Sequence, residues 1–144
     1  MTESERNLGR RWFEQVWNQG RREAIAEMLE PGILIHDGAV ESKGPEGFYA
    51  FFDRIQATLS DMKIDIHDTF AEGDKVCVQW SSTAKHTGAG LGMAPTGETV
   101  HVTGITIFRI RDEKIVEAWQ NWDMLGFLEQ LNKQPRAAVY IASA

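Results

Sequence analysis

The residues best suited to chemistry gather where a predicted strand runs into a predicted helix, within residues 114–131. One carboxylate and two amides stand there beside two indoles: Trp119, Gln120, Asn121, Trp122 and Asp123. Polar groups that face an apolar core cost free energy unless they are paired, so such groups usually have a role. A carboxylate here could transfer a proton, and an amide could hold a carbonyl oxygen.

Asp123 and Gln120 each have two interpretations. Asp123 could be an acid/base at the mouth of a pocket, or only the N-cap of the helix that follows, because Asp is favoured at that position. Strand alternation groups Gln120 with Val116, Ala118 and Trp122. If that face is inward, the Gln120 amide could orient a ligand carbonyl, and the alternative is a hydrogen-bonded polar group of the core.

A histidine offers a second possible proton acceptor. His36 ends an apolar strand pattern, and its pKa lies near the physiological range. The alternative is a core or rim histidine bonded to the backbone. Elsewhere, His101 should alternate away from the buried face of its strand. No set of His, Cys, Asp and Glu residues has the spacing of metal ligands, so we expect no metal site.

Helical spacing predicts two long helices with aromatic buried faces. The T-x-x-E pattern at Thr2 and Glu5 predicts a capping box at the start of the first helix. Apolar residues then recur with helical period: Leu8, Trp12, Phe13, Val16 and Trp17. A short helix follows and is broken at Pro31. Pro45 suits the start of another helix with a similar stripe, formed by Phe48, Phe51, Phe52, Ile55 and Leu59.

From residue 61 onward the apolar period changes to two, which predicts strands linked by tight turns. One face of the first of these strands should carry Met62, Ile64, Ile66 and Phe70. Residues 88–97 form a glycine-rich loop, which we interpret as a flexible flap with Leu91 and Met93 as apolar contacts. This order of helices, strands and a last helix predicts an α+β fold with an antiparallel sheet, in a single domain over residues 1–144.

Composition excludes several classes of protein. The net charge of −6 argues against general binding to nucleic acid phosphates. No apolar run is long enough to cross a bilayer, and the N-terminus has no signal peptide. The single cysteine, Cys77, cannot form an internal disulfide, which fits a reducing compartment. We therefore expect a cytoplasmic protein that binds neither nucleic acid nor a membrane.

The order of several short motifs resembles a known family. The motifs are F-x-x-V-W-N-x-G from Phe13, G-P-E-G-F from Gly44, A-E-G-D-K-V from Ala71, G-I-T-I-F-R-I from Gly104 and W-D-x-x-G from Trp122. Together they resemble the SnoaL-like polyketide cyclases of the nuclear transport factor 2-like superfamily. The resemblance covers about residues 5–131 and leaves residues 133–144 as a tail.

The resemblance implies a cone of curved antiparallel sheet, packed against N-terminal helices, with a central pocket and a homodimer or larger homo-oligomer. It implies an intramolecular aldol cyclisation that needs no cofactor or metal, with an aspartate as acid/base. That aspartate aligns with Gln120, and a family histidine aligns with Thr106. Glutamine can donate a hydrogen bond to a carbonyl but cannot accept a proton at neutral pH.

Two main functions remain open. The first is a cofactor-free enzyme for enolate chemistry on a small apolar or aromatic carbonyl compound, with Asp123, Gln120 and His36 as catalytic residues. The second is a module that binds such a ligand without turning it over. Ligand contacts are expected from Trp12, Phe13, Trp17, Phe48, Phe52, Trp80, Met93, Thr106, Phe108 and Trp122. An epoxide-hydrolase-like arrangement around Arg109 or Arg111 is the least favoured alternative.

Overall fold

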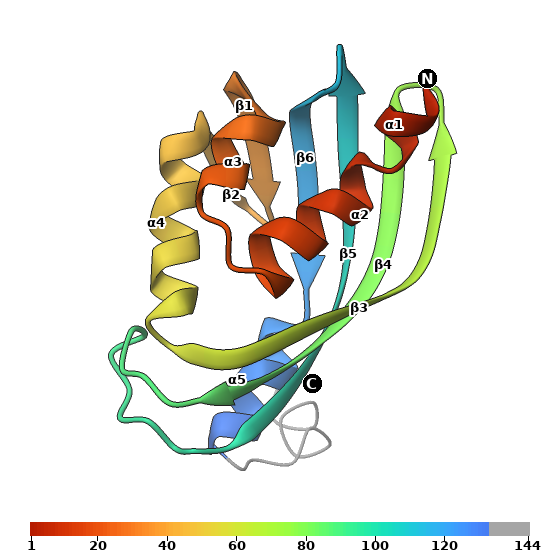
Figure 1. Cartoon of the computed structure of the whole chain (residues 1–144). Helices are drawn as coiled ribbons and strands as arrows, with labels where there is room; N and C mark the ends of the chain where they lie inside the picture. The colour runs from red at the N-terminus through yellow and green to blue at the C-terminus, as the bar shows by residue number, and fades with distance from the viewer. Residues whose placement is uncertain (133–144) are drawn as a thin grey trace.

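The computed structural model describes residues 1–132, and the predicted tail at 133–144 lies outside them. Five helical segments and two strands come first, and four further strands and a final helix follow. The helical segments are α1 (Glu3–Arg6), α2 (Leu8–Trp12), η1 (Phe13–Asn18), α3 (Glu23–Met28), α4 (Pro45–Gln56) and α5 (Met124–Asn132). In Figure 1 the helices α2, α3 and α4 lie on one side of a strongly curved sheet, and α5 follows the end of β6. The predicted α+β class is confirmed.

The sheet has six strands in the order β2-β1-β6-β5-β4-β3 and does not close. Its strands are β1 (Leu29–Asp37), β2 (Val40–Lys43), β3 (Leu59–Glu72), β4 (Lys75–His86), β5 (Thr99–Arg111) and β6 (Lys114–Trp122). β1 pairs with β6 in parallel, which corrects the prediction of a purely antiparallel sheet. The cause is the crossover: α4 carries the chain from β2 to the far edge, and the later hairpins bring β6 back beside β1.

The N-terminal helices form the layer that covers the inner face of the sheet. The predicted capping box is present, because the Glu5 amide donates to Thr2 Oγ1 and the Thr2 amide donates to the Glu5 carboxylate. The predicted apolar stripe is buried, with Leu8, Phe13 and Val16 almost fully inaccessible. The stretch is not one regular helix, however, because η1 is a π-helix. The π-helical segment carries the second half of the apolar stripe, with Phe13, Val16 and Trp17 buried.

Two side chains hold the helices against backbone edges that have no neighbouring strand. Asn18 of η1 accepts from the Ile64 amide at 2.6 Å and donates to the Ile64 carbonyl at 3.0 Å, on the edge strand β3. Gln130 of α5 makes the same pair of bonds to the His101 backbone, both at 2.7 Å, where β5 runs past the end of β6. Each side-chain amide makes the hydrogen bonds that a neighbouring strand would otherwise make, because backbone groups at a sheet edge need partners.

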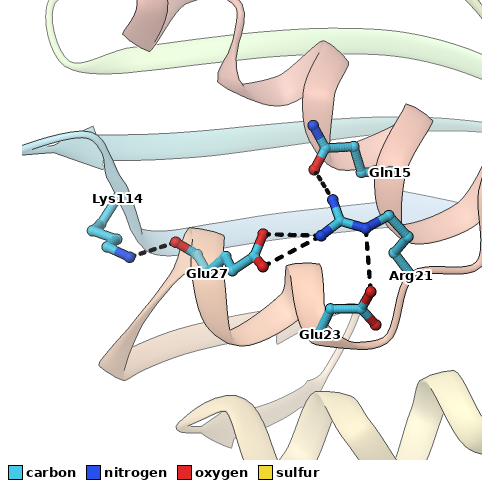
Figure 2. A network of polar contacts seen from close by, with 5 residues as sticks. All are labelled: Gln15, Arg21, Glu23, Glu27 and Lys114. Carbon is cyan, nitrogen blue, oxygen red and sulfur yellow. Dashed lines mark hydrogen bonds and ion pairs between the residues drawn. The ribbon is translucent and has the colours of Figure 1, made fainter.

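Figure 2 shows how η1, α3 and the start of β6 are tied together by polar contacts. Arg21 donates to Gln15 at 2.7 Å and pairs with Glu23 at 3.2 Å and with Glu27 at 3.3 Å. Lys114 of β6 donates to the Glu27 carbonyl. These carboxylates are more than half exposed, so each pair contributes little to stability, and the network mainly fixes geometry.

Two irregular positions in the strands change which residues face the core. The register of β3 against β4 shifts between Ile66 and Asp68, so the alternation reverses beyond that point. Phe70 is consequently 62% exposed, which corrects the prediction that it shares a face with Ile64 and Ile66. A similar shift in β6 makes Ile115 the buried residue at its start, in place of the predicted inward position of Val116. A bulge inserts one residue and therefore moves later side chains to the other face.

The glycine-rich loop at 88–97 is anchored against the end of α4. The amides of Thr87 and Gly88 both donate to the Thr58 carbonyl. A Cβ at Gly88 would lie 1.9 Å from the Ala57 carbonyl oxygen, so the close approach requires glycine. Leu91 and Met93 pack against the core. Flexibility of this loop stays a prediction.

The outer face of the sheet carries no helix in Figure 1 and exposes two large apolar side chains, Phe70 and Ile105. The predicted homo-oligomer and the single domain stay predictions. Within residues 1–132, no helix has both the length and the apolar character needed to cross a bilayer.

Candidate functional site

A cavity lies between the inner face of the sheet and the helices. Its volume is about 60 Å³, or about 520 Å³ of empty space when its open mouth is counted. Side chains from η1, α4, α5 and four strands line it: Phe13, Trp17, Phe51, Ile55, Leu59, Met62, Ile64, Trp80, Ser82, Val102, Gln120, Trp122 and Phe127. Eleven of these thirteen are apolar or aromatic, which favours an apolar ligand.

Gln120 and Ser82 are the polar residues of this lining, and neither side chain has a hydrogen-bonding partner within residues 1–132. Buried polar side chains usually find partners in the protein or in ordered water. An amide beside an apolar cavity can therefore take a ligand atom as its partner. Strand alternation groups Gln120 and Trp122 on one face without saying which way it points, and their place in the lining shows that this face is the inward one.

The sheet register gives Gln120 two neighbours on its own face. Thr106 of β5 is its partner on one side, and Asp37 of β1 is its partner on the other. Thr106 is 2% exposed, and its Oγ1 accepts a hydrogen bond from Trp80 Nε1 at 3.0 Å. Thr106 thus holds the Trp80 indole against the cavity. Gly104 leaves room for this indole, since a Cβ there would lie 2.2 Å from Trp80 Cζ2.

Asp37 is the residue that the sequence analysis did not select. It is half-buried at the end of β1, on the inner face, and its carboxylate has no partner within residues 1–132. Burial raises the pKa of the Asp37 carboxyl, because a charged form is disfavoured where water is partly excluded. Strand alternation was the available signal, since Asp37 shares a face with the buried Ile33 and His36 does not.

Asp123 caps the final helix. Its Oδ1 accepts a hydrogen bond from the Gly126 amide at 2.9 Å, and its carbonyl accepts from Phe127 at 3.1 Å. This is the geometry of an N-cap, which satisfies an amide that the first turn of α5 leaves open. Asp123 is not among the residues that line the cavity. A catalytic role for it stays a prediction.

His36 lies on the outer face, away from the cavity. Its Nε2 bonds with Glu117 at 2.8 Å and its Nδ1 with Glu41 at 3.1 Å, while its ring stacks on Trp119 at 5.4 Å. The hydrogen bond with Glu117 raises the pKa of His36, and the charge of Glu41 adds to the effect. Arg109 pairs with Glu117 on this same face, at 3.7 Å. Its pairing there gives no support to the epoxide-hydrolase-like arrangement.

The predicted ligand contacts divide into two groups. Four of them line the cavity: Phe13, Trp17, Trp80 and Trp122. Six lie outside the lining, in the core or beside it: Trp12, Phe48, Phe52, Met93, Thr106 and Phe108. Helical spacing identified the buried face of the first helical stretch, but only Phe13 and Trp17 of that face line the cavity. The sequence analysis did not select the other lining residues as ligand contacts, because tertiary packing decides which buried side chains border the cavity: Phe51, Ile55, Leu59, Met62, Ile64, Ser82, Val102 and Phe127.

Within the described part of the chain, no group of three or more His, Cys, Asp or Glu side chains could hold a metal ion. No residue of the cavity lining has an ionisable side chain. The chemistry that this arrangement can perform rests on hydrogen bonding by Gln120 and on proton transfer by a nearby carboxylate.

Known structures share this architecture. A candidate SnoaL-like polyketide cyclase from Jannaschia sp. CCS1 matches with a TM-score of 0.82 and 24% identity, over 92% of this chain and 94% of that one. AclR, a candidate hydroxylase from Streptomyces galilaeus, matches with a TM-score of 0.83 and 23% identity, over 99% and 92%. IdmH, a candidate polyketide cyclase from Streptomyces antibioticus, matches with a TM-score of 0.71 and 28% identity, over 83% and 93%.

No curated protein sequence matches the chain significantly. The sequence model of SnoaL-like polyketide cyclases, however, matches residues 7–131, which include every strand of the sheet and nearly all of the helices. The resemblance that the motifs suggested is thereby confirmed, and the chain belongs to the SnoaL-like polyketide cyclase family.

Proposed function

We propose that this chain binds a small apolar carbonyl compound in its cavity and catalyses cofactor-free enolate chemistry on it, such as an intramolecular aldol cyclisation. The observation that carries the proposal is the Gln120 amide, which has no partner in the described chain and stands in a lining of aromatic and aliphatic side chains. Membership of the SnoaL-like family supports a polyketide-like substrate.

The walls and the amide have separate tasks in this function. Phe13, Trp17 and Trp122 surround the cavity with apolar surface, and each Å² that a ligand removes from water stabilises the complex by about 25 cal/mol. The Gln120 NH₂ group donates to the ligand carbonyl. When that oxygen becomes an enolate oxygen, the same hydrogen bond strengthens, and a single donor of this kind lowers a barrier by about 3 kcal/mol.

Binding is tested with a ligand pair that differs in the carbonyl group. Tryptophan fluorescence is titrated with methyl benzoylacetate, a β-keto ester, and with propylbenzene, which lacks a carbonyl. We expect Gln120→Leu to weaken binding of the keto ester about tenfold, which corresponds to about 1.4 kcal/mol, and to leave propylbenzene unaffected.

Asn121→Leu is the matched control, because Asn121 is the next residue of β6 and is exposed on the opposite face. It should change neither affinity. Equal weakening of the keto ester by Gln120→Leu and Asn121→Leu would remove the basis of the proposal.

A non-catalytic binding module is the second candidate, and one observation favours it. No residue that lines the cavity has an ionisable side chain, and the predicted acid/base residues Asp123 and His36 lie outside the lining. A pure binding protein would hold the ligand with unchanged affinity through long incubation and would form no product. Proton exchange between the bound ligand and solvent, faster than in buffer alone, would exclude this candidate.

A further inference from the structure

We propose that Asp37 is the proton acceptor of this site and works beside the Gln120 amide. The inference rests on the proposed function, since it assigns the base for a carbonyl ligand held by Gln120. It places the carboxylate one strand away from the position that the family resemblance gives it, on β1 instead of β6.

The register of the parallel pair brings the two side chains together. Asp37 is the direct partner of Gln120 in the β1–β6 ladder, and neighbouring strands lie about 4.8 Å apart. The preceding pair of residues shows which face is which. His36 is the ladder partner of Trp119, and their rings stack on the outer face. Successive residues of a strand point to opposite faces, so Asp37 and Gln120 share the inner one.

The surroundings of Asp37 suit a base. Its carboxylate is half-buried and has no hydrogen bond or ion pair within residues 1–132. Asp37 does not itself line the cavity, but it is the ladder partner of Gln120, which does. Other carboxylates near the inner layer are already engaged: Asp53 pairs with Arg22 at 2.9 Å, and Asp123 caps α5. A carboxylate without partners keeps its lone pairs for a ligand proton, whereas one held by a cation or by amides is a weaker base.

No charged side chain offsets the burial of Asp37. Its ladder partners, Val40 on β2 and Gln120 on β6, are uncharged. On α3, Glu23 and Glu27 pair with Arg21. Burial is the cause of the raised pKa of Asp37, which brings this carboxyl closer to the pH at which a general base works well.

The proposed proton transfer involves only the ligand, Asp37 and Gln120. The ionised Asp37 takes a proton from the carbon beside the carbonyl, and the electron pair of that C–H bond forms the enolate. The enolate oxygen accepts the hydrogen bond of Gln120. Return of the proton to carbon gives exchange with solvent. In a cyclisation, the enolate carbon instead attacks a second carbonyl of the same molecule, and Asp37 returns its proton to the new alkoxide.

The test measures deuterium uptake at the carbon between the two carbonyls of methyl benzoylacetate in heavy water, by mass spectrometry, with the rate in buffer subtracted. The variants are Asp37→Asn, Asp37→Glu and the control Asp65→Asn, which makes the same change at an exposed carboxylate on β3. Affinity is measured in parallel by tryptophan fluorescence, so that binding and proton transfer are separated.

We expect Asp37→Asn to slow exchange at least 100-fold and to change the affinity less than threefold. Asp37→Glu should keep part of the activity, and Asp65→Asn should match the wild type. The exchange rate of the wild type should rise with pH, with a midpoint above the ordinary aspartate range, because only the ionised form accepts a proton.

Exchange by Asp37→Asn at the wild-type rate would overturn the assignment of Asp37 and leave the proposed binding function intact. Binding by the wild type without any exchange would overturn the assignment of Asp37 and the catalytic part of the proposed function, and would favour the non-catalytic binding module. A wild type that does not bind methyl benzoylacetate at all would overturn the proposed function, and the assignment of Asp37 with it.

Discussion

The two faces of the β1–β6 pair use polar residues in opposite ways. On the outer face, His36 is held by Glu41 and Glu117, and its ring covers Trp119. On the inner face, one residue further along each strand, Asp37 and Gln120 have no partner in the described chain. The outer residues His36, Glu41 and Glu117 are also polar, but they form hydrogen bonds with one another.

This difference separates structural polar groups from those that a ligand can use. A side chain whose hydrogen bonds are satisfied gains little from a ligand, whereas an unpaired group beside an apolar cavity gains a partner when the ligand arrives. The choice between His36 and Asp37 as candidate base therefore depends on the face and the partners of each residue. Four changes test the comparison.

Loss of an inner aromatic residue should have the largest effect. Phe13 is 1% exposed, lines the cavity and packs against Trp80 and Phe108, so Phe13→Ala should lower the free energy of unfolding by about 3–5 kcal/mol. Phe70→Ala is the matched change on the outer face and should stay within about 0.5 kcal/mol. Urea unfolding midpoints measure both. Similar losses would show that the two faces do not differ as described.

Thr106→Val should have the next largest effect. It removes the acceptor of Trp80 Nε1 and leaves that N–H buried, which costs about 1–3 kcal/mol of unfolding free energy. Thr103→Val makes the same change three residues away on the same strand, at an exposed position, and should be nearly neutral. Urea unfolding followed by tryptophan fluorescence reports stability and the environment of Trp80 together. An unchanged midpoint for Thr106→Val would contradict the role of this hydrogen bond.

Asp37→Asn should increase stability slightly at neutral pH. The raised pKa means that the ionised carboxylate is less favourable in the folded state than in the unfolded one. Stability of the wild type should fall as pH rises from the ordinary aspartate pKa through the raised value, and the advantage of the variant should vanish below that window. Urea titrations across pH 3 to 8 would reveal it. A destabilised variant at neutral pH would show that the ionised Asp37 makes favourable interactions.

Glu117→Gln should have the smallest effect, seen as a change in pH dependence. The raised pKa of His36 gives stability that is fully present below the ordinary value near 6.5 and is lost as pH rises through the folded value. Without the Glu117 charge this decline should become shallower, while Glu41→Gln, at the more exposed partner, should alter it less. Thermal unfolding between pH 5 and 9 measures the slope. An identical slope in wild type and Glu117→Gln would show that this pair does not tune His36.

The sequence predicted most of what depends on local pattern. The capping box at Thr2, the buried stripe from Leu8 to Val16 and the helix start at Pro45 all follow from short-range spacing, and the structure confirms each. The grouping of Gln120 with Trp122 on one face also followed from alternation along one strand, and both line the cavity. Such features are decided by neighbours within a few residues, which a single sequence displays.

The errors came from pairing between distant segments. The sequence predicted that Phe70 faces inward. The bulge near Ile66 depends on pairing with the partner strand, and the alternation along β3 gives no sign of it. Six predicted ligand contacts lie outside the cavity lining and stay predictions, because helical spacing gives a buried face but not which part of it borders a cavity. His36 was selected for its residue type, and the structure places it on the outer face, bonded to Glu41 and Glu117.

The sequence by itself determined the family, the helices, the alternation of the strands and the presence of an amide at position 120. The tertiary structure alone decided that β1 runs parallel beside β6 and that Asp37 is consequently the neighbour of Gln120. Period-two alternation assigns each residue to a face of its strand, but 83 residues separate these two side chains along the chain (120 − 37). Their meeting depends on the crossover through α4 and on the register of the sheet, which non-local packing fixes.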